Sequence, residues 1–170
     1  MNSTNNSEVL QLPDIVQLSE YQGNFQSFYE AVYQIFVMDF VDSQPRFEGI
    51  KLGLKKHPKI DGKEYTFYHF THDGSDEENR IPNLRRMERM PWPAPIINQS
   101  SHQGLKVWRN NRGKHERILI LYEQEKYLII LEDRKDYIIP WTAYLVDYPN
   151  KMRKLLGEYK AFKSQNRPAD

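Results

Sequence analysis

The chain has no cysteine among its 170 residues. This absence excludes disulfide bonds, a thiolate nucleophile and zinc sites built from cysteine. No apolar run approaches the roughly 20 residues that a membrane-spanning helix needs. The first seven residues also have neither the basic start nor the apolar centre of a signal peptide. We therefore expect a cytoplasmic protein that makes no membrane contact.

Several motifs of metal- and nucleotide-dependent enzymes are also missing. The sequence contains no glycine-rich phosphate-binding loop, no His-Glu-x-x-His pair and no Gly-x-Ser-x-Gly motif. Its acidic residues show no cluster with the spacing of a magnesium site. These absences predict that the protein uses neither a metal nor a cofactor.

Basic residues are absent from the first 45 positions, which hold six acidic residues. The remainder carries 24 basic and 17 acidic residues, a net charge of +7. A basic body favours a polyanionic partner, and an acidic front segment could mask or steer that contact. The alternative is that the first helix simply has a solvated acidic face.

What the chain does have is a high aromatic content, 13% of all residues. Such a composition favours a folded protein, and the length fits one domain with a real core. We expect a flexible polar tail over residues 1–12, a single α+β domain over 13–163 and a second flexible tail over 164–170.

The first half of the chain shows helical and strand-like patterns in turn. Phe25, Phe28, Val32 and Phe36 recur at helical spacing, and Pro45 follows as a stop signal. The predicted elements are a helix over 24–41, strands over 47–54 and 64–71, an exposed acidic loop over 73–79, a short helix over 82–90 and an extended proline-rich connection after it.

The second half predicts an antiparallel meander because its strand-like segments follow one another through short polar connections. The predicted strands cover residues 106–109, 117–123, 126–132 and 137–146, and a closing helix covers 149–162. The unbroken apolar runs 118–122 and 127–131 indicate central strands covered by helices on at least one face. The expected fold class is α+β, with an antiparallel sheet of four or slightly more strands and helices packed on one face.

His69 and His72 are candidates for proton transfer, because a histidine titrates near neutral pH. Three residues apart, they point to opposite faces of a strand unless the strand ends between them. His69 is favoured because its aromatic neighbours would fix the ring. The alternative is a half-buried strand histidine followed by a loop histidine.

Arg85, Arg86 and Arg89 are expected to lie on one side of the short helix, because their spacing makes them surface neighbours. Guanidinium groups bind phosphate in a bidentate manner, so the cluster suits an anion between them. The alternative is pairing with the acidic loop 76–78. The opposite side of this helix is expected to be apolar, formed by Ile81, Leu84 and Met87.

A cluster of basic residues in the meander suits a nucleic-acid partner. A basic patch interleaved by Trp108 suits single-stranded nucleic acid, and it consists of Lys106, Arg109, Arg112, Lys114, His115 and Arg117. Solvated hairpin tips are the alternative.

On the last strand, Thr142 and Tyr144 are expected to share a face with Ile138 and Pro140. Thr142 could orient a phosphate there, although threonine is also an ordinary strand former.

Taken together, these residues resemble a family. The matching parts are Phe67-Tyr68-His69-Phe70-Thr71, Arg80, the segment 84–92, the meander 105–134 and Tyr137-x-x-x-Trp-Thr-Ala-Tyr144. The chain resembles the metal-independent endoribonucleases that include barnase, EndoU, colicin-type nucleases and RelE-type toxins, in particular their phage-associated branch. The resemblance implies helices on one face of a four-stranded antiparallel sheet. It also implies attack of a ribose 2′-hydroxyl on the neighbouring phosphate, which leaves a 2′,3′-cyclic phosphate and a 5′-hydroxyl.

The resemblance further implies catalytic residues and partners. The catalytic residues would be His69, Arg85, Arg89 and Thr142. Together with the patterns described above, the predicted substrate-binding residues are His72, Arg80, Arg86, Lys106, Trp108, Arg117 and Tyr144. The second proton carrier stays open among His72, His115 and Tyr144. The implied partners are RNA and a protein antitoxin or inhibitor. The alternatives are a non-catalytic nucleic-acid-binding module and a phage or mobile-element protein-interaction domain that docks through its acidic first helix.

Overall fold

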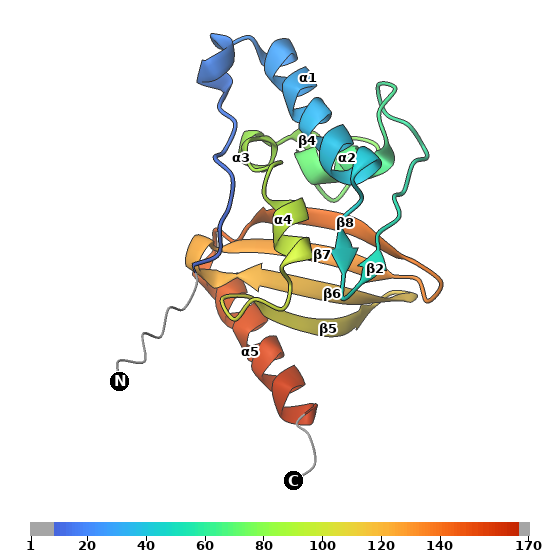
Figure 1. Ribbon diagram of the computed structural model, residues 1–170, viewed down its shortest axis with the longest axis vertical. Helices are drawn as coiled ribbons and strands as arrows, with labels where there is room; N and C mark the ends of the chain where they lie inside the picture. The colour runs from blue at the N-terminus through green and yellow to red at the C-terminus, as the bar shows by residue number, and fades with distance from the viewer. Residues whose placement is uncertain (1–8, 167–170) are drawn as a thin grey trace, which may run out of the picture.

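A four-stranded antiparallel sheet lies at the centre of the computed structural model, which describes residues 9–166 (Figure 1). Its strands follow the chain order, so each strand pairs with the next one in the sequence. This arrangement confirms the predicted α+β class and the antiparallel meander. The strands are β5 (Lys106–Arg112), β6 (His115–Tyr122), β7 (Tyr127–Asp133) and β8 (Ile138–Leu145).

The hairpin between β5 and β6 is tighter than the sequence predicts. Arg112 pairs with His115, so the connection is only Gly113 and Lys114. Gly113 has a φ of 68°, a conformation that glycine adopts without steric cost. Residues 110–112, which fall in the connection between two predicted strands, therefore belong to β5.

Strand β8 contains a bulge that changes which side chains share a face. Ile130 pairs with Thr142 and Leu131 pairs with Pro140, which leaves Trp141 as the extra residue. An extra residue reverses the alternation of side chains beyond it. The expectation that Thr142 shares a face with Pro140 is therefore wrong, and Trp141 and Thr142 line the same cavity.

Four helices lie on one side of the sheet (Figure 1). The predicted helix over 24–41 is confirmed as α1, which begins at an Asn24 cap and continues as a π-helical turn. A short 3₁₀ turn precedes it at Leu18–Tyr21. The helical elements on this side are α1 (Phe25–Phe36), η2 (Val37–Asp42), α2 (Tyr65–Thr71), α3 (Leu84–Glu88) and α4 (Pro93–Asn98).

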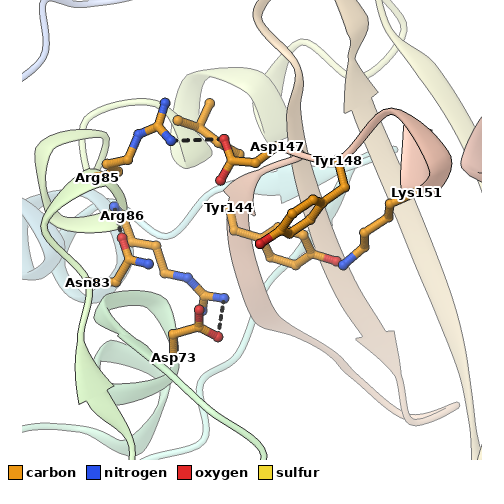
Figure 2. A pocket seen from close by; sticks show the side chains of 9 residues that line it. Asp73, Asn83, Arg85, Arg86, Tyr144, Asp147, Tyr148 and Lys151 are labelled. Atoms are coloured by element: carbon orange, nitrogen blue, oxygen red, sulfur yellow. Dashed lines mark hydrogen bonds and ion pairs between the residues drawn. The ribbon is translucent and has the colours of Figure 1, made fainter.

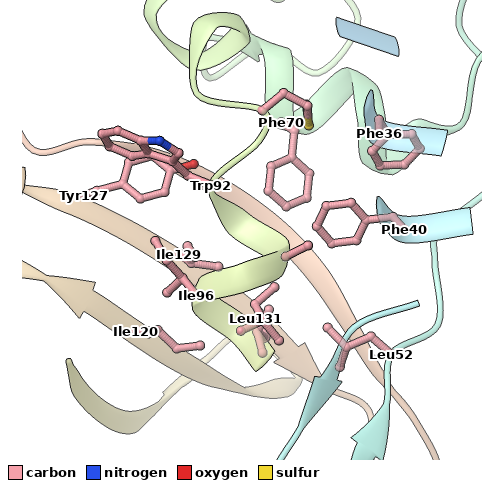
Figure 3. Packing of buried hydrophobic residues seen from close by; sticks show 14 of the residues in the cluster. Phe36, Phe40, Leu52, Phe70, Trp92, Ile96, Ile120, Tyr127, Ile129 and Leu131 are labelled. Carbon is pink, nitrogen blue, oxygen red and sulfur yellow. The ribbon is translucent and has the colours of Figure 1, made fainter. Parts of the chain in front are cut away.

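The core lies between these helices and the sheet (Figure 3). Phe36, Phe40 and Phe70 from the helices meet Ile129 and Leu131 from the sheet, and each of these side chains is at most 1% exposed. Complete burial of such a side chain contributes about 1.5–3 kcal/mol. This face therefore provides most of the apolar burial that holds the fold together.

The strand predicted over residues 64–71 is wrong, because Tyr65–Thr71 forms helix α2. All seven residues are buried, so the segment has no polar face that would reveal helical spacing. Its aromatic and β-branched residues favour a strand locally, and packing overrides that preference. Thr71 fits the helix by donating from Oγ1 to the Phe67 carbonyl at 2.8 Å.

The strand predicted over residues 47–54 is also wrong, because only a small hairpin forms there, in which β1 (Arg46–Phe47) pairs with β2 (Ile50–Lys51). The proline-rich segment after residue 91 is helix α4 instead of an extended connection. Pro93 and Pro95 fit its first turn, where backbone N–H groups have no helical acceptor.

The short helix predicted over residues 82–90 forms only at Leu84–Glu88, as α3. In the sequence it follows a hairpin in which β3 (His72–Asp73) pairs with β4 (Ile81–Pro82). Its predicted apolar side is wrong, because Ile81 is 70% exposed and Leu84 is 42% exposed, and only Met87 is buried. The helix is too short to bury a continuous stripe.

Helix α5 (Pro149–Gln165) packs on the other face of the sheet (Figure 1). There it covers a second cluster that contains Trp108, Leu121, Leu128 and Leu155. The expectation of helices on one face therefore holds for α1–α4 and does not hold for α5. None of the helices between residues 9 and 166 combines the length and hydropathy needed to cross a bilayer.

Residues outside both predicted domain boundaries, 13 and 163, belong to the fold. Leu10 is 6% exposed and packs in the core. Helix α5 continues to Gln165. The remaining parts of the predicted tails, residues 1–8 and 167–170, lie outside the described residues.

Candidate functional site

A cavity of about 400 Å³ lies beside β8, between that strand, helix α2 and the β3–β4 hairpin. Its lining contains four arginines and two carboxylates, a net charge of +2 with His69 neutral. We call it the cationic cavity. The side chains that bring charge or proton-transfer chemistry to it are His69, Glu77, Arg80, Arg86, Arg117 and Thr142.

Arg86 ties together the elements around the cavity. Its Nη1 donates to the carbonyls of His69 at 3.2 Å and His72 at 2.9 Å and to Thr142 Oγ1 at 3.2 Å. Its Nη2 donates to Asp73 at 3.2 Å. Desolvation lowers the pKa of Arg86 from its ordinary value, more than nearby Asp73 raises it. An arginine remains charged under such a shift, so a positive charge is held at the base of the cavity.

Three unpaired arginine nitrogens lie around this cavity. The Nε atoms of Arg80, Arg86 and Arg117 are buried and have no hydrogen-bond partner among residues 9–166, as is also true of Arg89 Nε, which lies outside the cavity. His69 Nδ1 is likewise buried without a partner in that range. Arg80 pairs with Glu77 through Nη2 at 2.8 Å, whereas Arg117 forms no ion pair with the described residues. Buried donors normally find an acceptor, so the cluster suits a bound anion.

His69 is held on three sides by its surroundings. Its ring is 2% exposed and lies between Tyr65 and Trp141, with ring centroids 4.9 and 4.7 Å away. Nε2 is 2.8 Å from Glu77 Oε2 and 3.2 Å from the Tyr65 hydroxyl. Desolvation lowers the pKa of His69 more than the bond to Glu77 raises it. The ring is therefore neutral at pH 7, the form that accepts a proton.

Glu77 is the shared hydrogen-bond partner of the side chains around His69. Partial burial by itself would raise its pKa, but hydrogen bonds from Arg80, Tyr65 and His69 lower the pKa to about 2. Burial and the neighbouring Glu77 raise the pKa of Tyr65, which keeps the Tyr65 hydroxyl protonated as a donor to Glu77. The Glu77 side chain is 52% exposed, so this carboxylate stands at the rim of the cavity.

A smaller pocket of about 230 Å³ adjoins the cationic cavity (Figure 2). The two share Asp73, Arg86 and Tyr144. Arg85 lies in this second pocket and pairs with Asp147 at 2.9 Å. The Tyr144 ring is close to two cations, with Lys151 Nζ at 4.3 Å and Arg86 Cζ at 5.1 Å from its centroid. Tyr144 therefore stands between two cationic pockets.

The structure brings together six of the predicted site residues. His69, Arg80, Arg86, Arg117, Thr142 and Tyr144 line the cationic cavity. Thr142 is already engaged, because its hydroxyl donates to the His69 carbonyl at 3.4 Å and accepts from Arg86. Its role in this arrangement is to fix Arg86.

Other predicted residues lie elsewhere. Arg89 donates to the Arg85 carbonyl at 3.1 Å and lies over the Trp92 ring, so α3 does not present three arginines together. A five-residue helix between two loops sends each guanidinium toward a different neighbour. His72 does not line the cavity, and its Nδ1 is 2.9 Å from Thr71 Oγ1.

The predicted surface around Trp108 is wrong. Trp108 is 1% exposed, because helix α5 covers it. Its indole nitrogen donates to Glu158 at 3.0 Å. Lys106 pairs with Glu123 at 2.7 Å. Neither residue lines the cationic cavity.

Sequence reasoning missed Glu77, Tyr65 and Trp141 as parts of the site. The alternative that the loop 76–78 pairs with Arg85, Arg86 and Arg89 is wrong, because these arginines pair with Asp147, Asp73 and Glu88. The loop residue Glu77 pairs instead with Arg80. Tyr65 could not be found from a strand model, because in a helix it lies one turn before His69. The position of Trp141 at the cavity depends on the bulge in β8, which no local sequence pattern predicts.

Among the described residues, no group of three or more histidine and acidic side chains could hold a metal ion. Comparisons of the chain with models of known protein families, with curated proteins and with solved structures gave no match. The functional assignment therefore depends on the cavity itself.

Proposed function

We propose that the protein binds single-stranded RNA at the cationic cavity and cleaves it by attack of a ribose 2′-hydroxyl on the adjacent phosphate, with no metal. The observation that carries the proposal is the set of three buried arginine Nε donors without acceptors around one cavity. A phosphodiester supplies acceptor oxygens with the right charge and geometry for such donors.

The arginines would serve the transition state as well as binding. Attack of the 2′-hydroxyl places additional negative charge on the phosphate oxygens. Preorganised cations in a partly dry cavity stabilise that charge more than bulk water does. Arg86 is the best placed for this role, because its bonds to His69, His72 and Thr142 fix it before substrate arrives.

His69 and Glu77 form the pair that would transfer a proton. A neutral imidazole accepts the proton of the 2′-hydroxyl, and the carboxylate of Glu77 stabilises the imidazolium that forms. The nitrogen that would accept this proton is Nδ1, because Nε2 is bonded to Glu77 and Nδ1 has no partner among the described residues. Since His69 is only 2% exposed, a substrate atom reaches Nδ1 only when the side chains that cover the ring move apart. Tyr144, which lines the same cavity, is the candidate for the second proton carrier.

The burial of His69 favours a second candidate function, binding of RNA without cleavage. Binding requires only the arginines and a ring on which a base can stack, and Tyr144 provides that ring. In either case a protein inhibitor or antitoxin would match the cavity by presenting acidic side chains to it.

The test is incubation of end-labelled single-stranded RNA with the protein in EDTA, followed by analysis of the product ends. The proposal predicts cleavage with cyclic phosphate and 5′-hydroxyl ends, loss of cleavage in His69→Asn, and a decrease of about 10²–10³-fold in Arg117→Gln. Arg46→Gln is the matched control, because Arg46 lines neither pocket. Binding without cleavage would select the second candidate, and absence of both would refute the proposal.

A further inference from the structure

A third cavity of about 460 Å³ lies under helix α5 and borders the cationic cavity. We call it the α5 cavity. It shares Arg112, Arg117, Ile130 and Tyr144 with the cationic cavity, so the two cavities adjoin. Its volume is within the roughly 300–1,000 Å³ typical of small-molecule sites. Its floor is apolar and consists of Leu119, Leu128, Ile130 and Leu155.

Glu158 is held rigidly at the edge of this cavity. Its Oε1 accepts from Trp108 Nε1 at 3.0 Å and from Asn110 Nδ2 at 2.5 Å. Trp108 is 1% exposed, so one of these two donors is fixed in the core. Within residues 9–166, Oε2 accepts no hydrogen bond. One carboxylate oxygen is therefore locked in place and the other is unengaged.

Asn110, which lines the same cavity, carries a second acceptor without a partner among the described residues. Its Nδ2 is used by Glu158, while its Oδ1 is buried and has no partner within the described part of the chain. Cationic donors also border the cavity, since Arg112 and Arg117 line it and neither forms an ion pair with a described residue. The α5 cavity thus offers two acceptors, guanidinium donors and an apolar floor.

We propose that the α5 cavity binds the guanine base of an RNA strand whose phosphate lies in the cationic cavity. The inference rests on the proposed RNA binding and goes further by naming the base. Guanine presents two adjacent donors, N1–H and N2–H₂, which match the free oxygens of Glu158 and Asn110. It also presents two adjacent acceptors, O6 and N7, which match an arginine. The apolar floor receives the face of the ring.

The other bases leave these oxygens poorly satisfied. Adenine and cytosine each bring one amino donor next to a ring nitrogen that is an acceptor, and uracil has a single donor between two carbonyls. An acceptor placed against a carboxylate oxygen is repelled. A base that cannot donate to these acceptors is rejected, because it displaces water from them and gives no donor in return.

The test is fluorescence anisotropy with four five-nucleotide RNAs, UUXUU, in which X is G, A, C or U. A 2′-O-methyl group on every ribose removes the attacking hydroxyl, so that binding is measured without cleavage. The wild-type protein is expected to bind the guanine RNA about tenfold or more tightly than the other three. Inosine at X lacks the N2 amino group and should lose a large part of this preference.

Glu158→Gln is the informative variant. Glutamine keeps an oxygen for Trp108 and Asn110 and replaces the free acceptor by an amino donor. The ratio of guanine to adenine affinity should fall to within about threefold, whereas Glu123→Gln, which alters a carboxylate paired with Lys106, should keep it. The affinity ratio is the readout, because removal of a negative charge strengthens binding to every RNA alike.

Each outcome bears on one proposal. Equal wild-type binding of all four RNAs would overturn the guanine assignment while RNA binding stands. A guanine preference that survives Glu158→Gln would overturn the assignment to this cavity. No binding to any RNA would refute the proposed function itself. The wild-type comparison of guanine with inosine needs no variant, so it tests the inference even if Glu158→Gln does not fold.

Discussion

The two faces of the sheet are built differently. The face under α1–α4 is closed by aromatic and aliphatic side chains, with Phe36, Ile129 and Leu131 at most 1% exposed. The opposite face is covered by α5 only in part, and beside β8 it borders the cationic cavity, where the Nε atoms of Arg80, Arg86 and Arg117 have no acceptor among residues 9–166. Residues that stabilise the fold are therefore largely separate from residues available to a ligand. Substitutions on the two faces should have different consequences.

The largest effect is expected in the closed face. Phe36→Ala removes a fully buried ring that contacts Phe40 and Phe67, with ring centroids 5.4 and 5.3 Å away. Such a cavity should lower the free energy of unfolding by about 3–5 kcal/mol, measured by chemical denaturation. Phe25→Ala is the control, because Phe25 on the same helix is 42% exposed. Equal losses in the two variants would contradict the assignment of the core to this face.

Two neighbouring arginines on α3 test whether structural and ligand-binding residues can be told apart close to the cavity. Arg86→Met removes the closest side-chain donor to each of the carbonyls of His69 and His72, which leaves only the longer bonds from Thr142 and Arg80, and should cost about 2–3 kcal/mol of unfolding free energy. Arg85→Met removes an ion pair between side chains that are more than half exposed, and should cost less than about 1 kcal/mol. Denaturation of both variants gives the comparison, and a reversed order would show that Arg86 is not structural.

Glu77, at the rim of the cationic cavity, should make the free energy of unfolding depend on pH. The pKa of Glu77 is lowered from 4.5 to about 2 in the folded protein, so folding favours the carboxylate. Its contribution to stability is complete above pH 4.5 and is lost as the pH falls toward 2. Glu77→Gln should therefore narrow the difference in unfolding free energy between pH 5 and pH 2.5. An unchanged difference would mean that Glu77 is not held by Arg80 and His69.

The smallest effect on stability is expected at Arg117, which forms no ion pair with residues 9–166. Arg117→Gln should change the free energy of unfolding by less than about 0.5 kcal/mol. RNA affinity should nevertheless fall, and the slope of log affinity against log salt should decrease by about 1, as expected for one lost phosphate contact. A large loss of stability with no change in salt dependence would place Arg117 among the structural residues.

The sequence predicts the closed face better than the open one. Helix α1 has a polar side and a cap at Asn24, and the meander strands are separated by polar turns, so periodicity finds both. Helix α2 is buried on every side, which removes the periodic signal that identifies a helix. The pattern of its seven residues therefore predicts a strand.

The site is harder to predict because long-range contacts define it. Arg86 meets Thr142 across 56 positions of sequence. Trp141 faces the cavity only because of a bulge, and Arg89, one turn from Arg85, turns away from it. The sequence predicts that histidine, arginine and threonine side chains form the site. Which of the arginines converge on the cavity depends on packing.

The central claim is that the buried arginine Nε groups receive a phosphate. Nitrogen-15 NMR of the arginine Nε–H groups during titration with the 2′-O-methyl RNA UUGUU tests it directly. Resonances of Arg80, Arg86 and Arg117 should shift progressively, and that of Arg46, whose Nη1 donates to the Gly49 carbonyl, should not. Saturating RNA that leaves all three unchanged, or that shifts Arg46 as much, would contradict the account.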